Sequence, residues 1–241
     1  MSTNRIRIRF AKVGKVRFTS HRDLARIWER AMRKANVRVA YSEGFSPRPK
    51  LHFGLALSTG HESQAEYLDV DLVDEVRLDE LATRLDPVLT PGVTVTGADF
   101  VASGTPSLQE DVVACRWAFT LDGVDHERAR DAVAHALAAD TITVTRTRKG
   151  EERTDDVRSA IEALTIVDDT TPVVLDAILA TKPRGLRPSE LLAAVFPNDP
   201  EPEHLARRVV RLQQFIERDG SRCELPPLTQ APAPHALVVC A

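Results

Sequence analysis

The chain has 241 residues, of which 43% are hydrophobic and 28% charged, as in an ordinary globular protein. No apolar run approaches the roughly 20 residues that cross a bilayer, the N-terminal segment lacks the apolar core of a secretory signal, and the scattered cysteines form no zinc or iron–sulfur motif. Composition therefore favours a cytoplasmic protein with no cofactor or metal of its own.

The formal net charge of −3 conceals a strong segregation of charge along the chain. Residues 1–52 hold 14 Lys and Arg against 3 Asp and Glu, whereas the remaining residues carry a net charge of −14. This asymmetry favours an electropositive surface for a polyanion. The alternative is a basic region that docks on the acidic remainder of its own chain.

The first hundred residues predict elements in the order β-α-β-β-α-β. Residues 5–10 alternate strictly between apolar residues and the arginines Arg5, Arg7 and Arg9, which predicts a strand with one arginine face. A helix is predicted over 20–36, because Ser20 and Asp23 form a capping box and an apolar stripe follows at helical spacing. The other predicted elements are strand runs at 37–41, 50–58 and 65–72, a helix at 77–89 and a strand at 93–101.

This order is that of a ferredoxin-like fold, in which two helices cover one face of the sheet and leave the other face available. The second half is predicted to repeat the scheme in degenerate form. The predicted strands are 112–121, 141–148, 164–168 and 171–180. The predicted helices are 125–139, 156–164, 187–196 and 205–218, and Gly220 is expected to close the last of them. A charged insertion is expected at 149–156.

We therefore predict an α+β protein of two ferredoxin-like modules in tandem. A basic domain is expected over 1–101 and an acidic domain over 111–220, after a linker at 102–111. A flexible Pro-rich tail is expected over 221–241.

Basic side chains recur along the first predicted helix. Arg22, Arg26, Arg30 and Arg33 form a ridge opposite the apolar stripe, which indicates either a solvated face or a surface for phosphates. The same segment adds the arginine face of the first strand, together with Arg38, Arg48 and Lys50. In a ferredoxin-like fold the ridge and the arginine face point in opposite directions, so one ligand is not expected to touch both.

Two histidines are candidate proton carriers or anion ligands. Ser20 and His21 begin the first helix, where free N–H groups and the helix dipole favour an anion, although a surface histidine beside an N-cap is the alternative. His52 alternates with Leu51 and Phe53, so it is expected to share a face with the basic strand residues.

The segment "YSEGFSPRPK" (41–50) concentrates turn-forming, aromatic and basic residues. Tyr41 and Phe45 are suited to stack on bases, and Arg48 and Lys50 to contact phosphates, which is the chemistry of single-stranded nucleic-acid binding. The alternative is a rigid hairpin whose aromatic rings complete the core.

Several motifs carry a family resemblance: S-H-x-D-L at 20–24, Y-S-x-G-F-x-P-x-P-K at 41–50, G-x-x-S-x-x-E-Y at 60–67, and a D-x-R element at Asp156 and Arg158. On these motifs the chain resembles the radical SAM-linked proteins, a bacterial family of unknown function, over most of residues 4–220. The resemblance implies a companion of a radical SAM enzyme, since the chain lacks the CxxxCxxC that holds such an enzyme's cluster. It also places the 41–50 segment and the Ser20–His21 corner in one site.

Two functions follow from these observations. The preferred one is an RNA-binding or adaptor module, for tRNA or single-stranded RNA, without its own cofactor and serving a radical SAM enzyme; nothing points to DNA or a membrane. The alternative is a metal-independent endoribonuclease in which His21 or His52 is the general base and Tyr41 or Lys50 stabilises charge. A third possibility is a small anionic ligand bound near the Ser20 helix end.

Overall fold

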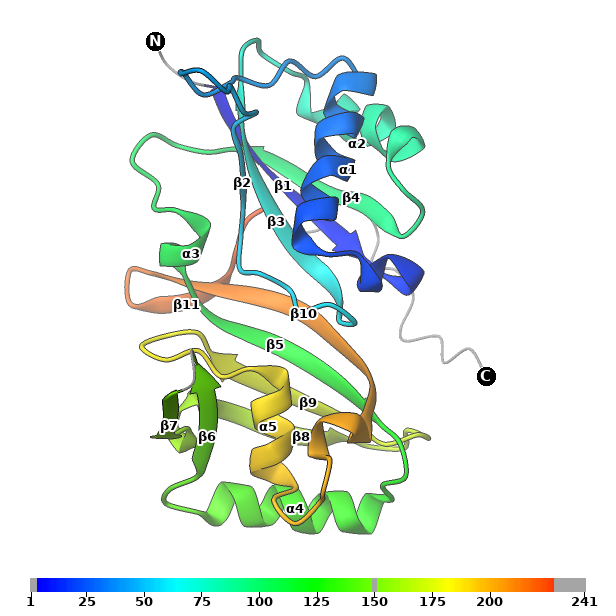
Figure 1. The fold of residues 1–241 in the computed structure, drawn as a ribbon, viewed down its shortest axis with the longest axis vertical. Helices are drawn as coiled ribbons and strands as arrows, with labels where there is room; N and C mark the ends of the chain where they lie inside the picture. The colour runs from blue at the N-terminus through cyan, green and yellow to red at the C-terminus, as the bar shows by residue number, and fades with distance from the viewer. Residues whose placement is uncertain (1–3, 149–150, 228–241) are drawn as a thin grey trace. The chain divides into compact units, whose positions relative to one another are not determined.

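The computed structural model describes residues 4–148 and 151–227 and divides the chain into two compact units (Figure 1). Unit 1 comprises residues 1–111 and 223–241, and unit 2 comprises residues 112–222. Each unit combines helices with antiparallel strand pairs, so the protein is of the mixed α+β class. Unit 2 begins at residue 112, directly after the predicted linker. From residue 223, near the start of the predicted tail, the chain again belongs to unit 1.

The strands of unit 1 pair in the order β4-β1-β3-β2, and each neighbouring pair is antiparallel. The predicted strand at 37–41 forms only isolated bridges, Val39 with Leu72 and Tyr41 with Pro49. The elements are β1 (Asn4–Lys12), η1 (Gly14–Phe18), α1 (His21–Lys34), β2 (Leu51–Phe53), β3 (Glu62–Leu72), α2 (Leu78–Leu85), η2 (Asp86–Val88), β4 (Val93–Phe100) and α3 (Leu108–Asp111).

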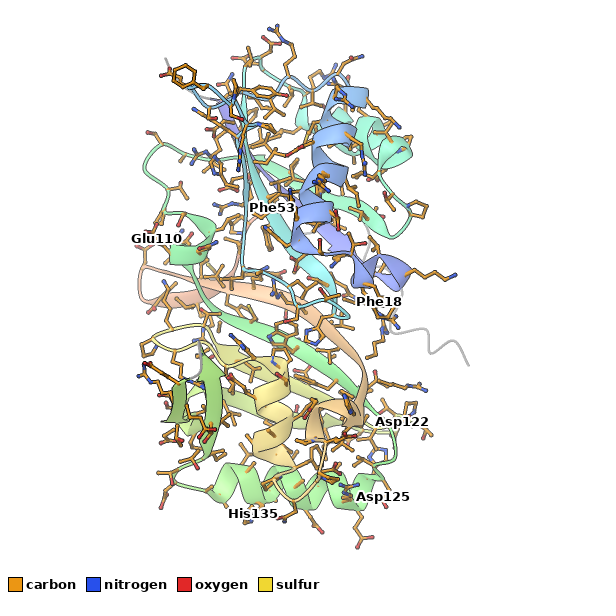
Figure 2. The ribbon with its side chains drawn as sticks, in the orientation of Figure 1. Phe18, Phe53, Glu110, Asp122, Asp125 and His135 are labelled. Atoms are coloured by element: carbon orange, nitrogen blue, oxygen red, sulfur yellow. The ribbon has the colours of Figure 1, made fainter. Side chains whose placement is uncertain are left out.

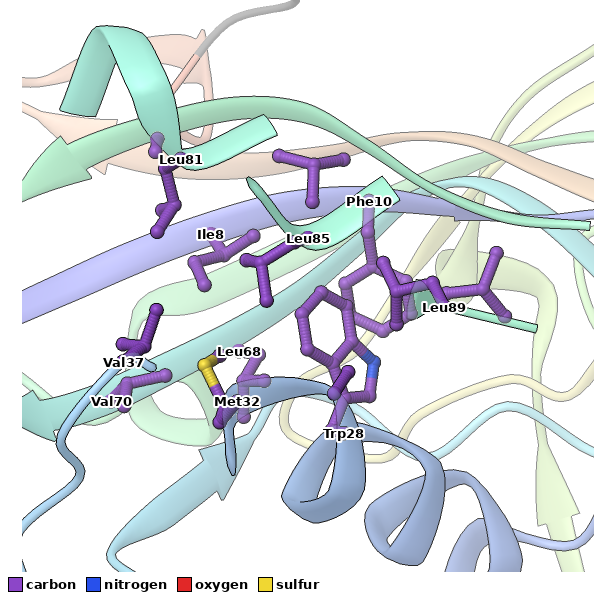
Figure 3. Close-up of a cluster of buried hydrophobic side chains, with 14 of the residues drawn as sticks. Ile8, Phe10, Trp28, Met32, Val37, Leu68, Val70, Leu81, Leu85 and Leu89 are labelled. Atoms are coloured by element: carbon purple, nitrogen blue, oxygen red, sulfur yellow. The ribbon is translucent and has the colours of Figure 1, made fainter. Parts of the chain in front are cut away.

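The core of unit 1 lies between one face of this sheet and the two helices α1 and α2 (Figure 3). The alternation predicted for β1 is confirmed, because Ile6, Ile8 and Phe10 are fully buried in this core. Trp28 of α1 meets the ring of Phe10 edge-on, with 4.9 Å between the ring centroids. Leu81 enters the same cluster from α2, so both helices cover the same face of the sheet.

The main strands of unit 2 pair antiparallel in the order β10-β5-β9-β8, and β6 and β7 form a separate two-stranded sheet. The elements are β5 (Val112–Leu121), α4 (His126–Ala138), β6 (Thr143–Arg148), β7 (Glu151–Asp156), η3 (Arg158–Ala160), β8 (Ile161–Val167), β9 (Val174–Ala180), α5 (Pro188–Val195), η4 (Pro202–Leu205), β10 (Ala206–Arg218) and β11 (Ser221–Glu224), within which the unit boundary falls.

The prediction of a final helix over 205–218 is wrong, because this segment is the strand β10. Three register shifts interrupt the pairing of β10 with β5, so the buried positions do not alternate and the segment resembles a helical stripe. Asp219 and Gly220 have φ of 51° and 72° and form a two-residue hairpin turn, so Gly220 does not close a helix. The Asp-Gly pair is a hairpin signal that the sequence already contained.

The prediction of a helix over 156–164 is also wrong. A single 3-10 turn, η3, is followed directly by β8, which pairs with β9 through a register shift that hides its alternation. The predicted charged insertion supplies the strand β7, although residues 149–150 lie outside the described residues. Of the predicted tail, Ser221–Glu224 form β11, and residues 228–241 lie outside the described residues.

Candidate nucleic-acid interface

The 41–50 loop is a hairpin held by its own backbone. The N–H of Ser42 donates to the carbonyl of Arg48 at 2.8 Å, and the N–H of Arg48 donates to Ser42 Oγ at 3.0 Å. Gly44 at the tip has φ of +119°, a conformation that L side chains rarely adopt. This bonding brings the two arms of the loop together without help from the core.

The aromatic rings of the 41–50 loop point into solvent. Phe45 is fully exposed and Tyr41 is 59% exposed, so the interpretation in which these rings complete the core is wrong. Arg48 is also exposed, while Lys50 is partly buried beside β3. Exposing a phenylalanine forgoes the roughly 1.5–3 kcal/mol that its burial would contribute, so burial of this ring does not stabilise the unit.

The helix α1 begins as its sequence predicts. Ser20 Oγ accepts the N–H of Asp23 at 3.2 Å and donates to the Asp23 carboxylate at 2.7 Å, which confirms the N-cap. The buried positions of α1 face the core and leave the four predicted arginines exposed. We call these residues the α1 ridge: Arg22, Arg26, Arg30 and Arg33. Within the ridge, Arg26 lies 3.3 Å from the Asp23 carboxylate.

Most of the arginine face of β1 is buried: Arg7 and Arg9 are enclosed, and only Arg5 is partly exposed. Arg7 forms two hydrogen bonds with Asp69 of β3, at 2.7 and 2.9 Å, and the two side chains are 7% and 5% exposed. Arg5 donates to Asp71 at 2.6 Å. These acids occupy the facing positions of β3, so the cationic charge is largely neutralised inside unit 1.

The last residue of β11 and the residue that follows it cover the end of this face. Arg9 is buried and pairs with Glu224 at 2.8 Å, and the hydroxyl of Tyr67 donates to the carbonyl of Leu225 at 2.6 Å. Leu225 is fully buried, and burial raises the pKa of the Tyr67 phenol. The expectation that this sheet face stays available is therefore wrong at its Arg9 end.

The other end of the face gathers three of the predicted residues. His52 Nε2 lies 3.8 Å from Asp71 Oδ2, and Lys50 and Arg5 are close enough to act on the same carboxylate. Burial alone would raise the pKa of Asp71, but the hydrogen bond and charge of Arg5, aided by His52 and Lys50, hold it below its usual value. Asp71 is therefore a carboxylate that orients the side chains around it.

His21 lies elsewhere, on the helix-covered side of the sheet. Its ring meets the ring of Phe53 edge-on at 5.1 Å, and it lines a cavity of about 10 Å³, enough for about one water molecule. The buried side chains of Lys12 and Glu66 line the same cavity. Sequence reasoning missed both, although Lys12 and Glu66 stand at core-facing positions of the two alternating strands, where an apolar residue is expected.

The structure thus separates the residues that were expected to form one site. His21 and His52 lie on opposite faces of the sheet, as their neighbours Phe53 and Asp71 show. The Ser20–His21 corner begins α1, whereas the 41–50 loop lies beyond its other end (Figure 1). With 14 residues, α1 places about 21 Å between the two.

Residues 4–148 and 151–227 contain neither a cluster of metal-ligating side chains nor a helix that could span a membrane. No group of three His, Cys, Asp or Glu side chains there is placed to hold a metal ion. No helix in that part of the chain has the length and apolar character needed to cross a bilayer.

The fold and the exposed residues define a mixed α+β protein whose unit 1 presents arginines and aromatic rings to solvent. The chain belongs to the family described as an uncharacterized protein conserved in bacteria (DUF2344), which matches residues 5–188. No curated protein matches the sequence.

Proposed function

We propose that the chain is an RNA-binding or adaptor module that serves a radical SAM enzyme, and that unit 1 binds single-stranded RNA or tRNA. The observation that carries this proposal is the 41–50 loop, which presents Tyr41, Phe45 and Arg48 to solvent on a backbone-bonded hairpin. Exposed aromatic rings stack on unpaired bases, and neighbouring cations neutralise the phosphates between them. Both features occur here within a few residues.

The α1 ridge supplies the second part of the surface. The helix carries five Lys and Arg against two acids, and all of these charged side chains are exposed. Binding to a phosphodiester backbone comes chiefly from the release of counterions by such cations, so a row of them along one helix favours a polyanion. Arg7 and Arg9 are left out of the proposed surface because their charges are buried against carboxylates.

We also propose that both units are ferredoxin-like modules. In chain order, the four main strands of unit 1 pair as fourth-first-third-second, and the main strands of unit 2, β5, β8, β9 and β10, pair in the same way. Each unit also has one helix after its first main strand and another after its third. The β6–β7 hairpin stands between α4 and β8, which makes unit 2 the degenerate copy.

The double variant Arg48→Ala/Lys50→Ala tests the RNA-binding proposal. We expect weaker binding to a fluorescent single-stranded RNA. The slope of log K against log salt concentration should become shallower by about 1.4, since each of the two lost phosphate contacts to a single strand contributes about 0.7. The matched control is Arg77→Ala/Arg153→Ala, which removes two exposed arginines that pair with Asp79 and Asp155. If the loop variant binds as tightly as the parent, the loop is structural and the proposal fails.

The association with a radical SAM enzyme rests on the motif resemblance at residues 20–24, 41–50 and 60–67. Pull-down of the full chain from a bacterial extract, followed by identification of bound proteins, tests it. Recovery of a protein with a CxxxCxxC cluster motif supports the association, and its absence from repeated pull-downs under cross-linking argues against it.

A metal-independent endoribonuclease is the second candidate, and the His52–Asp71 arrangement is the observation that favours it. The exposed His52 ring lies beside a carboxylate that can orient it, and Lys50 stands two residues away on the same strand face. In such a reaction His52 would take the proton of a ribose 2′-hydroxyl, whose oxygen attacks the adjacent phosphorus, while the 5′-oxygen leaves and takes a proton from water. Lys50 would stabilise the charge on the phosphate.

This candidate is tested by incubating total RNA with the parent protein and with His52→Ala and His21→Ala. Cleavage that disappears in His52→Ala and persists in His21→Ala supports it, because His21 lies on the opposite face of the sheet from His52 and Asp71. Intact RNA after incubation with the parent removes the candidate.

A further inference from the structure

Phe18 is an exposed aromatic ring at the end of α1 opposite the 41–50 loop (Figure 2). It is 62% exposed and closes η1, two residues before the N-cap Ser20. The guanidinium of Arg17 lies over one face of the ring, 4.7 Å from its centroid. In such a pair the free face of the aromatic ring can stack on a nucleobase, and the arginine can contact a phosphate.

The backbone that carries Phe18 is held firmly by buried groups. The ammonium of Lys12, itself 2% exposed, donates to the carbonyl of Thr19 at 3.0 Å and to that of Arg17 at 3.4 Å. The N–H of Gly60 also donates to the Arg17 carbonyl, at 2.9 Å. Buried Glu62 accepts from the N–H of Gly14 at 3.0 Å and from Arg17 Nη1 at 3.2 Å.

The backbone on both sides of Phe18 is thus fixed, while its ring stays in water. Buried charges are costly to desolvate, and here they fix the carbonyls on both sides of a ring that remains in water. An exposed ring on a fixed backbone loses little conformational entropy when a ligand stacks on it. This arrangement therefore suits a preorganised contact.

We infer that Phe18 is a second base-stacking position, and that single-stranded RNA runs from Phe18 along the α1 ridge to Tyr41 and Phe45. The inference rests on the proposed RNA binding and specifies its ligand as an unpaired strand. The helix between the two ends is about 21 Å long, which a stacked strand covers with about six nucleotides at 3.4 Å each. Arg22, Arg26 and Arg30 face solvent along that length.

A length series combined with two substitutions tests the inference on the full chain. Fluorescent single-stranded RNAs of about 3 and about 12 nucleotides are titrated with the parent, Phe18→Ala, Phe45→Ala and the double variant. The long RNA reaches both stacking positions, so each single change weakens its binding by between roughly 5-fold and 150-fold, and the losses multiply. The short RNA occupies one position at a time, so each single change costs it about 2-fold or less and only the double variant loses most of the binding.

Two further variants serve as controls. Phe18→Tyr keeps an aromatic ring and is expected to retain the parent's affinity. Phe100→Ala removes another exposed phenylalanine of unit 1, on β4, and is expected to have no effect on RNA. Thermal unfolding of each variant checks that the fold is intact.

The outcomes separate this inference from the proposed function. If the parent binds long RNA in a salt-sensitive way but Phe18→Ala binds it equally well, the inference fails and RNA binding by the loop stands. If the parent shows no salt-sensitive binding to either RNA, the proposed function fails and the inference with it. Binding of the parent to phosphatidylserine–phosphatidylcholine vesicles, lost in Phe18→Ala while RNA binding is unchanged, would assign the ring to a membrane surface and overturn the inference.

Discussion

Replacing Arg7 with methionine is expected to destabilise unit 1 by about 3–5 kcal/mol, because the change leaves the Asp69 carboxylate buried without its cation. The magnitude follows from the geometry. Two hydrogen bonds of 2.7 and 2.9 Å join the groups side by side, and neither side chain is more than 7% exposed. Water therefore cannot replace the lost partner, as it does for an exposed pair.

The second arm of this experiment changes both residues. Arg7→Met/Asp69→Leu replaces the pair by apolar side chains and removes the unpaired charge, so its free energy of unfolding is expected to return to within about 1–2 kcal/mol of the parent. The exposed pair of Arg77 and Asp79 is the matched control, and Arg77→Met is expected to cost less than about 1 kcal/mol.

Urea unfolding followed by the fluorescence of Trp28 measures these changes within unit 1. Trp28 is fully buried in that unit, and a Trp117→Phe background removes the signal of unit 2. A cost below about 1 kcal/mol for Arg7→Met would refute the reasoning, because the pair would then behave as a solvated one. If folded Arg7→Met bound RNA as weakly as Arg48→Ala/Lys50→Ala, Arg7 would have to be part of the RNA-binding surface, contrary to the proposal.

Three other changes probe the local structure of unit 1. Ser20→Ala should cost about 1 kcal/mol by removing the N-cap of α1, whereas Ser20→Gly should cost only a few tenths, and thermal unfolding distinguishes the two. The pKa of Asp71 lies below its usual value of 3.8 in the folded protein, so its ionised form contributes stability above about pH 4. The difference in stability between the parent and Asp71→Asn should therefore be largest at neutral pH and shrink as the pH falls below about 4. Equal differences at pH 3 and pH 7 would contradict the assignment. Gly92→Ala should destabilise by more than about 2 kcal/mol, because φ is +92° and the added Cβ would lie 2.3 Å from the Val13 carbonyl oxygen. Gly123→Ala is the control: its φ is +67° but the space around it is open, so it should cost only about 1 kcal/mol in urea unfolding.

The elements that the sequence predicted well are those whose signals are local. Residues 5–10 of β1 alternate in sequence between arginines and apolar residues, and α1 has both a cap and an apolar stripe, so residues within one strand or one turn of helix specify them. The sequence predicts a helix at β10, and the first residues of β8 fall in the predicted helix 156–164 while its second half matches the predicted strand 164–168. The buried positions of both strands depart from a period of two at register shifts. Only the pairing of each with its neighbour shows that the chain is extended there.

The candidate site divides in the same way. The sequence by itself determined the basic and aromatic content of the 41–50 loop and the arginine row of α1, because turn chemistry and helical periodicity place these residues locally. Only the tertiary structure decided which charges remain available to a ligand. Arg7 and Arg48 look equally basic in the sequence, but Asp69, 62 positions further along the chain, neutralises the first, while the second is exposed. The same holds in part for Phe18: Lys12 is close to it in sequence, but the buried Glu62, which accepts from Arg17, lies 45 positions further along the chain and is brought there by the pairing of β1 with β3.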